Sequence, residues 1–354
     1  MDYSSSSTTR PWNFAMLGKF TVFISTLAFG FLVLYCSSCN NYGQLLPSLG
    51  RRFSSSFNRF NLSSSIDDPV HDEYYELRNL LKAASTNEKT VILTYLNEAW
   101  AAPNSIFDIF LESFRIGNNT SYLLNHLLVI AVDDDAYSRC KTLVSHCYLL
   151  KSNASSTLAH QANFMTPVYL DMVWRRLAFL KTILTLGYNF VITDTDVVWF
   201  RDPFPHFIPE SDFQTSCDRF NGGQFDLNNF PNVGFLFARS NSRTIKFYEY
   251  WVSLRHKYPN LHEQDAFNRI KHEPSFKELG VKVRFLDTNY FSGFCSTSRD
   301  INKVCTMHAN CCVGLDRKIA DLNTTLSIWK NYFLGNHTAV SQPFHWTVPS
   351  KCHM

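Results

Sequence analysis

The sequence lacks an excess of either charge. Its 33 lysines and arginines against 30 aspartates and glutamates leave a formal net charge of +3 over 354 residues. Nucleic-acid binding depends on clustered cations that neutralise backbone phosphates, so this balance argues against a nucleic-acid partner. Internal repeats and low-complexity tracts are also missing from residue 73 onward. The 31 phenylalanines, 16 tyrosines and 7 tryptophans are enough for a large domain with a sizeable core.

Long uncharged apolar runs are scarce as well, and the one near the N-terminus is short. Residues 20–36 carry no charge over 17 positions, which at about 1.5 Å per residue is the lower limit for crossing a bilayer. The alternative is a cleaved signal peptide, whose apolar core has roughly 7–15 residues. We expect a single N-terminal transmembrane signal-anchor at 20–36, preceded by a cytoplasmic tail (1–19). A Ser/Asn-rich flexible stem (37–68) and a lumenal domain (69–354) follow.

Glycosylation sequons decide the expected orientation, because the basic residues on the two sides of the apolar run nearly balance. Six N-x-S/T sequons occur, and all of them follow the run. Their asparagines are Asn61, Asn118, Asn119, Asn153, Asn323 and Asn336. A single sequon is weak evidence, but six on one side favour a lumenal C-terminal part. The sequence therefore predicts a single-pass type II membrane protein.

Eight cysteines follow the stem, an even number that is consistent with disulfides in an oxidising lumen. They are Cys140, Cys147, Cys217, Cys295, Cys305, Cys311, Cys312 and Cys352. Their connectivity cannot be derived from the sequence. Cys140 and Cys147 on one unbroken helix would have Cα atoms about 10 Å apart, too far for a disulfide. These two can pair only if the helix ends between them.

Short apolar runs alternate with segments of helical spacing along the globular part. We expect strands at 90–96, 127–132, 148–150 and 189–193, and helices at 105–116, 136–145 and 167–186. This alternation predicts an α/β fold with a mainly parallel sheet, in which ligands bind at the carboxyl ends of the strands. Beyond residue 212 the pattern does not define the topology.

The most specific short motif is Asp194-Thr195-Asp196, which directly follows the apolar strand at 189–193 and precedes an aromatic segment. Two carboxylates at i and i+2 can face one ligand if the chain bends at the strand end. Such hard oxygen ligands suit Mg²⁺ or Mn²⁺, which bridges to diphosphate oxygens. The alternative is a solvated acidic turn. The strand before the motif and the aromatic residues after it favour the metal site.

Five blocks in the same order resemble the plant nucleotide-diphospho-sugar transferases of glycosyltransferase family 77. They are residues 94–114, 171–204, 232–251, 262–270 and 308–322. The resemblance implies a GT-A-like, Rossmann-related mixed sheet flanked by helices, a UDP-sugar donor, a divalent metal (usually Mn²⁺) and transfer with retention of anomeric configuration. It also implies a Golgi membrane location. The stem and the tail after residue 326 lie outside the similarity.

Carried over to this chain, the resemblance gives Asp194 contacts to the donor ribose and the metal, and it makes Asp196 a metal ligand. His308 resembles the late histidine that completes the metal site in many GT-A enzymes. A competing interpretation is a zinc site, because Cys305, His308 and the following cysteine pair 311–312 have zinc-ligand spacing. A structural histidine beside a disulfide is a third possibility.

Further donor-site candidates come from the same blocks. The resemblance places Asn232 and Gly234 in the donor pocket, where a glycine lets the backbone approach a ligand closely and an amide can bind sugar hydroxyls. A plain turn at the entry to a strand is the alternative. Asp265 is placed near the reacting sugar as the catalytic candidate, although an aspartate there could also cap the helix that follows.

The remaining candidates are polar residues in the first half of the predicted domain. Arg176, on the helix before the D-x-D strand, could meet the diphosphate. Thr94 and Asn97 end the first strand, where a nucleoside usually binds in such sheets. The aspartates at 133–135 could form a second metal site, but a solvated loop fits them better.

The sequence thus predicts a metal-dependent glycosyltransferase that moves a sugar, xylose or arabinose by family resemblance, from a UDP-sugar to a glycan or glycoprotein. Two other classes were weighed. A D-x-D hydrolase would need more acidic or histidine ligands at other strand ends, and the aspartates at 133–135 are the available cluster. A non-catalytic lumenal lectin or scaffold would keep the fold without the chemistry.

Overall fold

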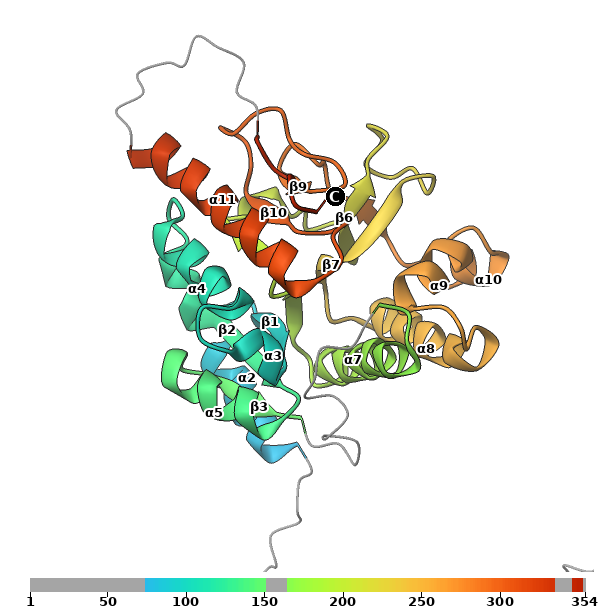
Figure 1. Cartoon of the computed structure of the whole chain (residues 1–354). Coiled ribbons are helices and arrows are strands. Elements are labelled where there is room, and N and C mark those ends of the chain that lie inside the picture. The colour runs from blue at the N-terminus through green and yellow to red at the C-terminus, as the bar shows by residue number, and fades with distance from the viewer. Residues whose placement is uncertain (1–73, 151–163, 335–345, 353–354) are drawn as a thin grey trace, which may run out of the picture. The chain divides into compact units, whose positions relative to one another are not determined.

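The computed structural model describes residues 74–150, 164–334 and 346–352 (Figure 1). Within these ranges no helix is long and apolar enough to cross a membrane. The predicted tail, anchor and stem all lie outside the described residues, as do Asn61, Asn153 and Asn336 of the sequons. The structure therefore describes much of the predicted lumenal domain.

Helices and strands alternate through the first half of this domain. Its elements are α2 (Tyr75–Ala84), β1 (Thr90–Leu96), α3 (Glu98–Ala101), α4 (Ile106–Ile116), η2 (Ser121–His126), β2 (Leu127–Ala131), α5 (Asp134–Leu143), β3 (Cys147–Leu149), α7 (Pro167–Thr185) and β4 (Asn189–Thr193). The predicted strands and helices are all present, and each end lies within two residues of its predicted position.

The second half completes the domain with further strands and helices. Its elements are β5 (Val197–Trp199), η3 (Phe204–His206), β6 (Phe213–Arg219), β7 (Phe230–Ala238), α8 (Ser242–Lys257), α9 (Glu263–Ile270), α10 (Pro274–Glu278), β8 (Val283–Phe285), β9 (Phe291–Gly293), β10 (Thr306–His308) and α11 (Leu315–Leu334).

Seven strands form one mixed sheet in the order β3-β2-β1-β4-β7-β6-β8. The first four are parallel to one another, as the alternating pattern predicts. β7 then runs antiparallel to both β4 and β6, and β8 is parallel to β6. The prediction of an α/β fold with a mixed sheet flanked by helices is confirmed.

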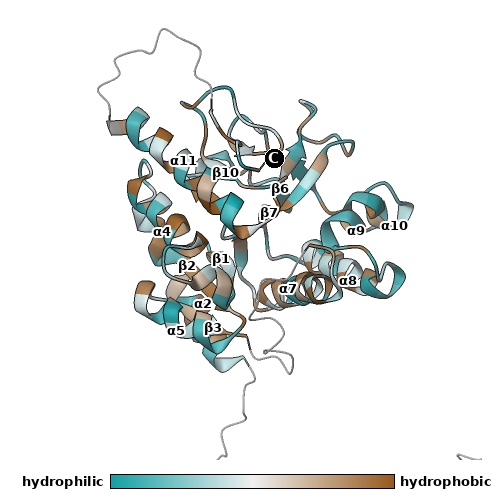
Figure 2. Cartoon of the chain, in the orientation of Figure 1, coloured by the Kyte–Doolittle hydropathy of each residue, from teal (hydrophilic) through white to brown (hydrophobic). Residues whose placement is uncertain are grey.

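The central strands are apolar on both faces because helices cover both sides of the sheet. In β1, Val91 and Leu93 pack into the core shared with α2, α7, α8 and α9, whereas Ile92 and Leu96 pack into the core shared with α4 and α5. Each fully buried side chain of this size stabilises the fold by about 1.5–3 kcal/mol. Figure 2 shows brown and teal positions mixed along α4, α7 and α11, as expected for helices with one buried side.

A second, three-stranded sheet in the order β5-β10-β9 brings the last part of the domain to the end of β4. β10 pairs antiparallel with β5, which sets His308 opposite Val197. A third apolar core fixes this sheet against α4 and α11, with Phe200 stacked on Trp329 at a centroid distance of 4.7 Å. This pairing positions the candidate site.

Three disulfides are formed among the described residues. Cys140 pairs with Cys147 at a Cα–Cα distance of 6.1 Å, and α5 ends at Leu143, between them, as the spacing argument requires. The other pairs are Cys295 with Cys311 and Cys312 with Cys352. Cys217 and Cys305 are buried free thiols, so six of the eight cysteines after the stem form disulfides.

Candidate active site

The D-x-D motif lies in a tight turn between β4 and β5. The Asp194 backbone N–H donates to the Gly234 carbonyl at 2.6 Å, and the Val197 N–H donates to the Asp194 carbonyl at 3.1 Å. From the neighbouring strand, the Ala309 N–H donates to the Asp196 carbonyl at 3.0 Å. The turn is therefore held against β7 and β10 by backbone bonds, and both carboxylates reach the same space.

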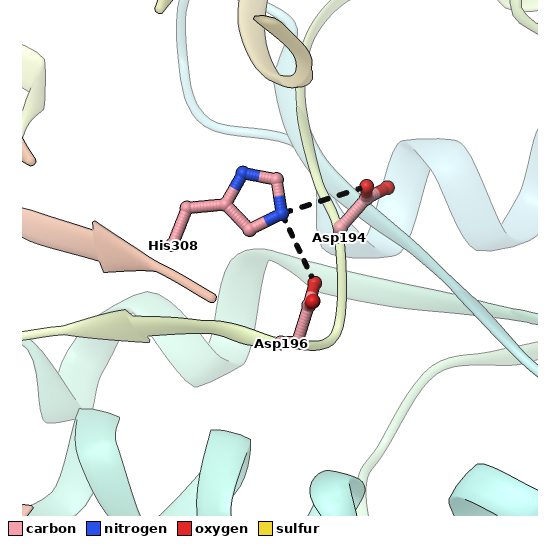
Figure 3. Close-up of side chains that lie close together, drawn as sticks. All are labelled: Asp194, Asp196 and His308. Carbon is pink, nitrogen blue, oxygen red and sulfur yellow. Dashed lines mark ion pairs between the residues drawn. The ribbon is translucent and has the colours of Figure 1, made fainter. Parts of the chain in front are cut away.

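Asp194, Asp196 and His308 converge there (Figure 3). The His308 Nε2 atom lies 3.2 Å from Asp196 Oδ1 and 3.9 Å from Asp194 Oδ2. One ligand atom from each residue can be chosen so that all three lie within 4.8 Å of one another. Asp196 Oδ1 is buried without a hydrogen-bond partner among the described residues. Two carboxylates, an imidazole and an unpartnered buried oxygen fit a divalent cation.

Lys318, in α11, contacts the same group and was missed in the sequence. Its Nζ atom is hydrogen-bonded to Asp196 Oδ2. Burial alone would raise the pKa of Asp196, but Lys318 and His308 hold it well below its usual range. Burial would likewise lower the pKa of His308, yet Asp196 and Asp194 raise it above the ordinary histidine value. Lys318 thus places a positive charge beside Asp196, one of the predicted metal ligands.

Arg176, predicted to meet the diphosphate, is held by two carboxylates. Its Nη1 atom lies 2.5 Å from Asp194 Oδ1, and its Nη2 atom lies 2.6 Å from Glu263 Oε1. This leaves Asp194 Oδ2 on the side of His308. In the structure Arg176 orients a predicted metal ligand, and Glu263, a residue that sequence reasoning did not select, orients Arg176.

Gly234 lies at the predicted donor pocket, where its backbone closely approaches the side chains of Asp194 and His308. A Cβ atom at this position would be 2.5 Å from Asp194 Oδ2 and 2.5 Å from His308 Cε1. The neighbouring Asn232 accepts a hydrogen bond from the Gly234 N–H at 3.0 Å through Oδ1. Both residues lie inside β7, whereas the sequence suggested a turn before the strand.

A cavity of about 500 Å³ opens beside the three converging residues. Of the predicted residues, its lining includes Asn97, Arg176, Asp194, Asp196, Asn232, Gly234 and His308. Further lining residues that the sequence did not reveal include Asp218, Glu263, Gln264, Asn310 and Lys318. Their relation to the motif depends on strand and helix pairing, so no spacing rule could have found them.

Two predicted residues do not line this cavity. Thr94 is fully buried beneath the D-x-D turn, with its Oγ1 3.1 Å from Thr195 Oγ1, so it supports the turn. Asp265 has a side chain that is 48% exposed and pairs with His262 Nε2 at 3.2 Å. Asp265 forms no capping hydrogen bond at the start of α9, where His262 is the N-cap residue.

The acidic run at 133–135 has a structural role at its first residue. Asp133 is buried, and its carboxylate accepts the Ala136 N–H and the Glu98 N–H, both at 2.8 Å. It caps α5 and joins it to α3. This differs from the solvated loop favoured by the sequence, because a cap requires the carboxylate to face the helix N-terminus.

The zinc interpretation of His308 does not fit the cysteines. Two of the three candidate thiolates, at Cys311 and Cys312, are used in disulfides. The third, Cys305, is buried, and burial raises the pKa of its thiol to about 12. A zinc site needs deprotonated thiolates, so the disulfide interpretation is the better one.

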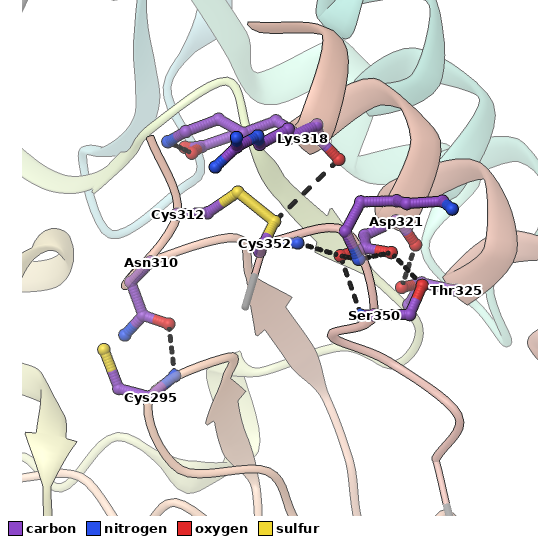
Figure 4. Close-up of a disulfide and its surroundings, with 11 residues drawn as sticks. Cys295, Asn310, Cys312, Lys318, Asp321, Thr325, Ser350 and Cys352 are labelled. Carbon is purple, nitrogen blue, oxygen red and sulfur yellow. Dashed lines mark hydrogen bonds and ion pairs between the residues drawn. A yellow bond between two sulfur atoms is a disulfide. The ribbon is translucent and has the colours of Figure 1, made fainter. Parts of the chain in front are cut away.

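The C-terminal segment is fastened to the helix that carries Lys318 (Figure 4). Asp321 is completely buried and accepts the backbone N–H groups of Ser350, Lys351 and Cys352 at 2.9–3.1 Å. The Cys312–Cys352 disulfide joins the C-terminal segment covalently to the loop that precedes α11. Together they fix the first turns of α11 against the cavity wall.

Comparison with known proteins places this geometry in a family context. A family model described as nucleotide-diphospho-sugar transferase matches residues 122–322. An uncharacterized protein of Arabidopsis thaliana is 47% identical over 282 residues, covering 79% of this chain and 74% of that one. The UDP-D-xylose:L-fucose alpha-1,3-D-xylosyltransferase 3 of the same plant is 25% identical over 281 residues, covering 72% of this chain and 70% of that one. Among solved structures, apo mouse xyloside xylosyltransferase 1 is similar with a TM-score of 0.41 at 15% identity, covering 63% of this chain and 98% of that one.

Proposed function

The chain belongs to the nucleotide-diphospho-sugar transferase family, and we propose that it moves a sugar from a UDP-sugar to a glycan or glycoprotein acceptor. It is a glycosyltransferase with a GT-A-like mixed α/β sheet. The observation that carries the proposal is the group formed by Asp194, Asp196 and His308 beside a cavity of about 500 Å³. A divalent cation held by such a group can bind the diphosphate of a nucleotide-sugar.

Each of these side chains has a distinct part in holding the donor. Asp194, Asp196 and His308 would hold a divalent cation, Mn²⁺ or Mg²⁺, through two carboxylate oxygens and one imidazole nitrogen. When bound, the metal supplies positive charge to the departing diphosphate. Arg176 keeps Asp194 in place, and Lys318 is close enough to Asp196 to place its charge beside the same diphosphate.

The reaction breaks the bond between the anomeric carbon and the diphosphate oxygen, and it forms a bond to an acceptor hydroxyl, whose proton is released. We place the reacting sugar against Glu263 and Gln264, which line the cavity, rather than against the half-exposed Asp265. Retention of configuration remains our expectation from the family resemblance. It requires the new bond to form on the face from which UDP leaves.

The proposed donor follows from the name of a related enzyme. The related xylosyltransferase is named for a UDP-D-xylose donor and an L-fucose acceptor, which supports xylose or another pentose such as arabinose as the transferred sugar.

We further propose a single-pass type II Golgi membrane protein anchored by residues 20–36, with its catalytic domain in the lumen. Protease added to intact Golgi vesicles should then spare the catalytic domain, and its digestion would contradict this topology.

Neither alternative class is favoured by an observation in the described residues. Those residues contain one group of histidine, cysteine and acidic side chains that could hold a metal, so a two-metal hydrolase has no second site there. Asp133, in the spare acidic run, is used as a helix cap. A lectin or scaffold would not need Asp194, Asp196 and His308 to converge.

The decisive experiment replaces Asp196 by asparagine in the full-length chain. Asp196→Asn keeps the size of the side chain but removes one of the two carboxylates, which should reduce UDP-sugar turnover by about a hundredfold or more. UDP release is measured with UDP-xylose and UDP-arabinose as donors. Thermal unfolding with UDP, Mn²⁺ or both should show that the pair stabilises wild type more than either alone.

Asp171→Asn is the matched control, because Asp171 lies on α7 in an exposed pair with Arg175. It should keep wild-type turnover. Full activity in Asp196→Asn, with unchanged Mn²⁺ dependence, would exclude the assigned site. Stabilisation of wild type by UDP and Mn²⁺ without any turnover would instead favour the non-catalytic alternative.

A further inference from the structure

One wall of the cavity carries three amide side chains that donate to a single carboxylate. Asp218 Oδ1 accepts from Asn232 Nδ2 at 2.7 Å and from Asn310 Nδ2 at 2.8 Å. Asp218 Oδ2 accepts from Gln264 Nε2 at 3.1 Å. The four residues come from β6, β7, α9 and the segment after β10, and all four line the cavity. We call this group the amide wall.

The orientation of each amide is fixed by a second hydrogen bond. The carbonyl oxygen of every amide accepts a backbone N–H, in the pairs Asn232 with Gly234 (3.0 Å), Gln264 with Val233 (3.0 Å) and Asn310 with Cys295 (3.1 Å). Figure 4 shows the last of these bonds, between Asn310 and Cys295. An amide whose oxygen and nitrogen are both engaged cannot flip, so the wall is ordered before any ligand binds.

The amide wall retains hydrogen-bonding capacity suited to hydroxyl groups. Each NH₂ group has two N–H bonds and gives one of them to Asp218, which leaves one donor on each amide. Asp218 Oδ2 accepts one hydrogen bond within the described residues and can accept another. A sugar hydroxyl both donates and accepts, so it can satisfy the carboxylate and an amide N–H together.

Among the described residues that line the cavity, every lysine and arginine side chain is paired with a carboxylate. Of the lysine and arginine side chains that line the cavity, Arg176 is held by two carboxylates and Lys318 is paired with Asp196. Glu263, which is 3% exposed, has an Oε2 atom without a hydrogen-bond partner in the described part of the chain. A ligand carboxylate here would face Asp218 and Glu263, and like charges at close range disfavour its binding.

The amide wall adjoins the metal-binding residues. Asn232 binds the N–H of Gly234, whose Cα faces Asp194 and His308 so closely that a Cβ would be 2.5 Å from each side chain. Asn310 follows His308 by two residues. In a UDP-sugar the sugar is bonded to the diphosphate, so a diphosphate at the metal site places the sugar near this wall.

We propose that Asp218, with the three amides of the wall, determines specificity by binding the hydroxyls of an uncharged sugar and excluding a uronic acid. The inference rests on the proposed function, because it assumes that the diphosphate of a UDP-sugar lies at Asp194, Asp196 and His308. Asp218 recognises hydroxyls through its carboxylate and rejects an acidic donor through its charge.

UDP-glucose and UDP-glucuronate test this, because they differ only in a hydroxymethyl against a carboxylate on the same ring. Binding to the full-length chain is measured by calorimetry with Mn²⁺ at pH 7.5. Wild type should bind UDP-glucuronate at least about tenfold more weakly than UDP-glucose. Asp218→Asn should narrow that ratio to within about threefold and weaken UDP-glucose binding, while affinity for UDP itself stays within about twofold.

Three outcomes separate the possible failures. If wild type does not bind UDP in a Mn²⁺-dependent way, the proposed function is wrong. If UDP binds but wild type has the same affinity for UDP-glucose and UDP-glucuronate, the inference about the amide wall is overturned, whether or not Asp218→Asn folds. If Asp218→Asn keeps the wild-type ratio, the discrimination does not come from Asp218. Asp171→Asn, which removes an exposed aspartate on α7, should match wild type throughout.

Discussion

Substitution of Gly234 by alanine provides a severe test of the metal site, because the methyl group would enter between two of its predicted ligands. The new Cβ would be 2.5 Å from Asp194 Oδ2 and 2.5 Å from His308 Cε1, whereas ordinary contacts begin at 3.4 Å. Each of the two side chains must therefore move by about 0.9 Å, the difference between 3.4 and 2.5 Å. Metal–ligand distances tolerate about 0.2 Å, so the three atoms could no longer bind one cation well.

The expected loss follows from this displacement. A misplacement of about 1 Å at a reacting centre costs on the order of a hundredfold in rate. We expect Gly234→Ala to reduce UDP-sugar turnover by about that factor. We also expect it to raise, by tenfold or more, the Mn²⁺ concentration that gives half-maximal thermal stabilisation in the presence of UDP. Overpacking should in addition lower the free energy of unfolding by about 1–3 kcal/mol.

Gly223→Ala is the matched control. It makes the same chemical change in a loop, where the Cβ would lie 3.1 Å from Asp226 Cβ and away from the cavity lining. It should leave the Mn²⁺ requirement unchanged. If Gly234→Ala requires no more Mn²⁺ than wild type, Asp194 and His308 do not share a metal, and the reasoning fails. A loss of stability without a change in Mn²⁺ requirement would lead to the same conclusion.

Two further predictions concern buried charges. Lys318→Met should lower the free energy of unfolding by about 3 kcal/mol in EDTA, because Asp196 is then buried without its cation, and Mn²⁺ should restore much of the loss. Lys330→Met, in an exposed pair on the same helix, should have little effect, and an equal loss with and without Mn²⁺ would contradict the assignment. Burial would raise the pKa of Asp321, but the N–H groups of residues 350–352 lower it below its ordinary value. The stability lost in Asp321→Asn should therefore be constant from pH 7 to about pH 5 and should shrink as the pH falls below about 4, so a loss that stays the same at all these pH values would refute the assignment.

The core strands and the D-x-D motif could be predicted from the sequence because both depend on residues close together in the chain. Residues 90–96 and 189–193 are apolar without alternation, which is the pattern of strands buried on both faces, and both strands were placed correctly. The end of a strand then marks where a polar residue can meet a ligand, so Asp194 and Asp196 stood out. The break between Cys140 and Cys147 followed from helix geometry alone.

The remainder of the site depended on tertiary structure, because its members are far apart in the sequence. His308 meets the motif since β10 pairs with β5, and Lys318 reaches Asp196 across 122 residues. On α9, Glu263 and Asp265 are two residues apart and so point about 200° from each other, and the packing of the helix decides which one faces the cavity. Asp218 belongs to β6, in the part of the sheet that the sequence pattern left undefined, and its three amide partners come from β7, α9 and the segment after β10. Local patterns thus determined the strands and the first two carboxylates, whereas long-range pairing determined which other charges and amides surround them.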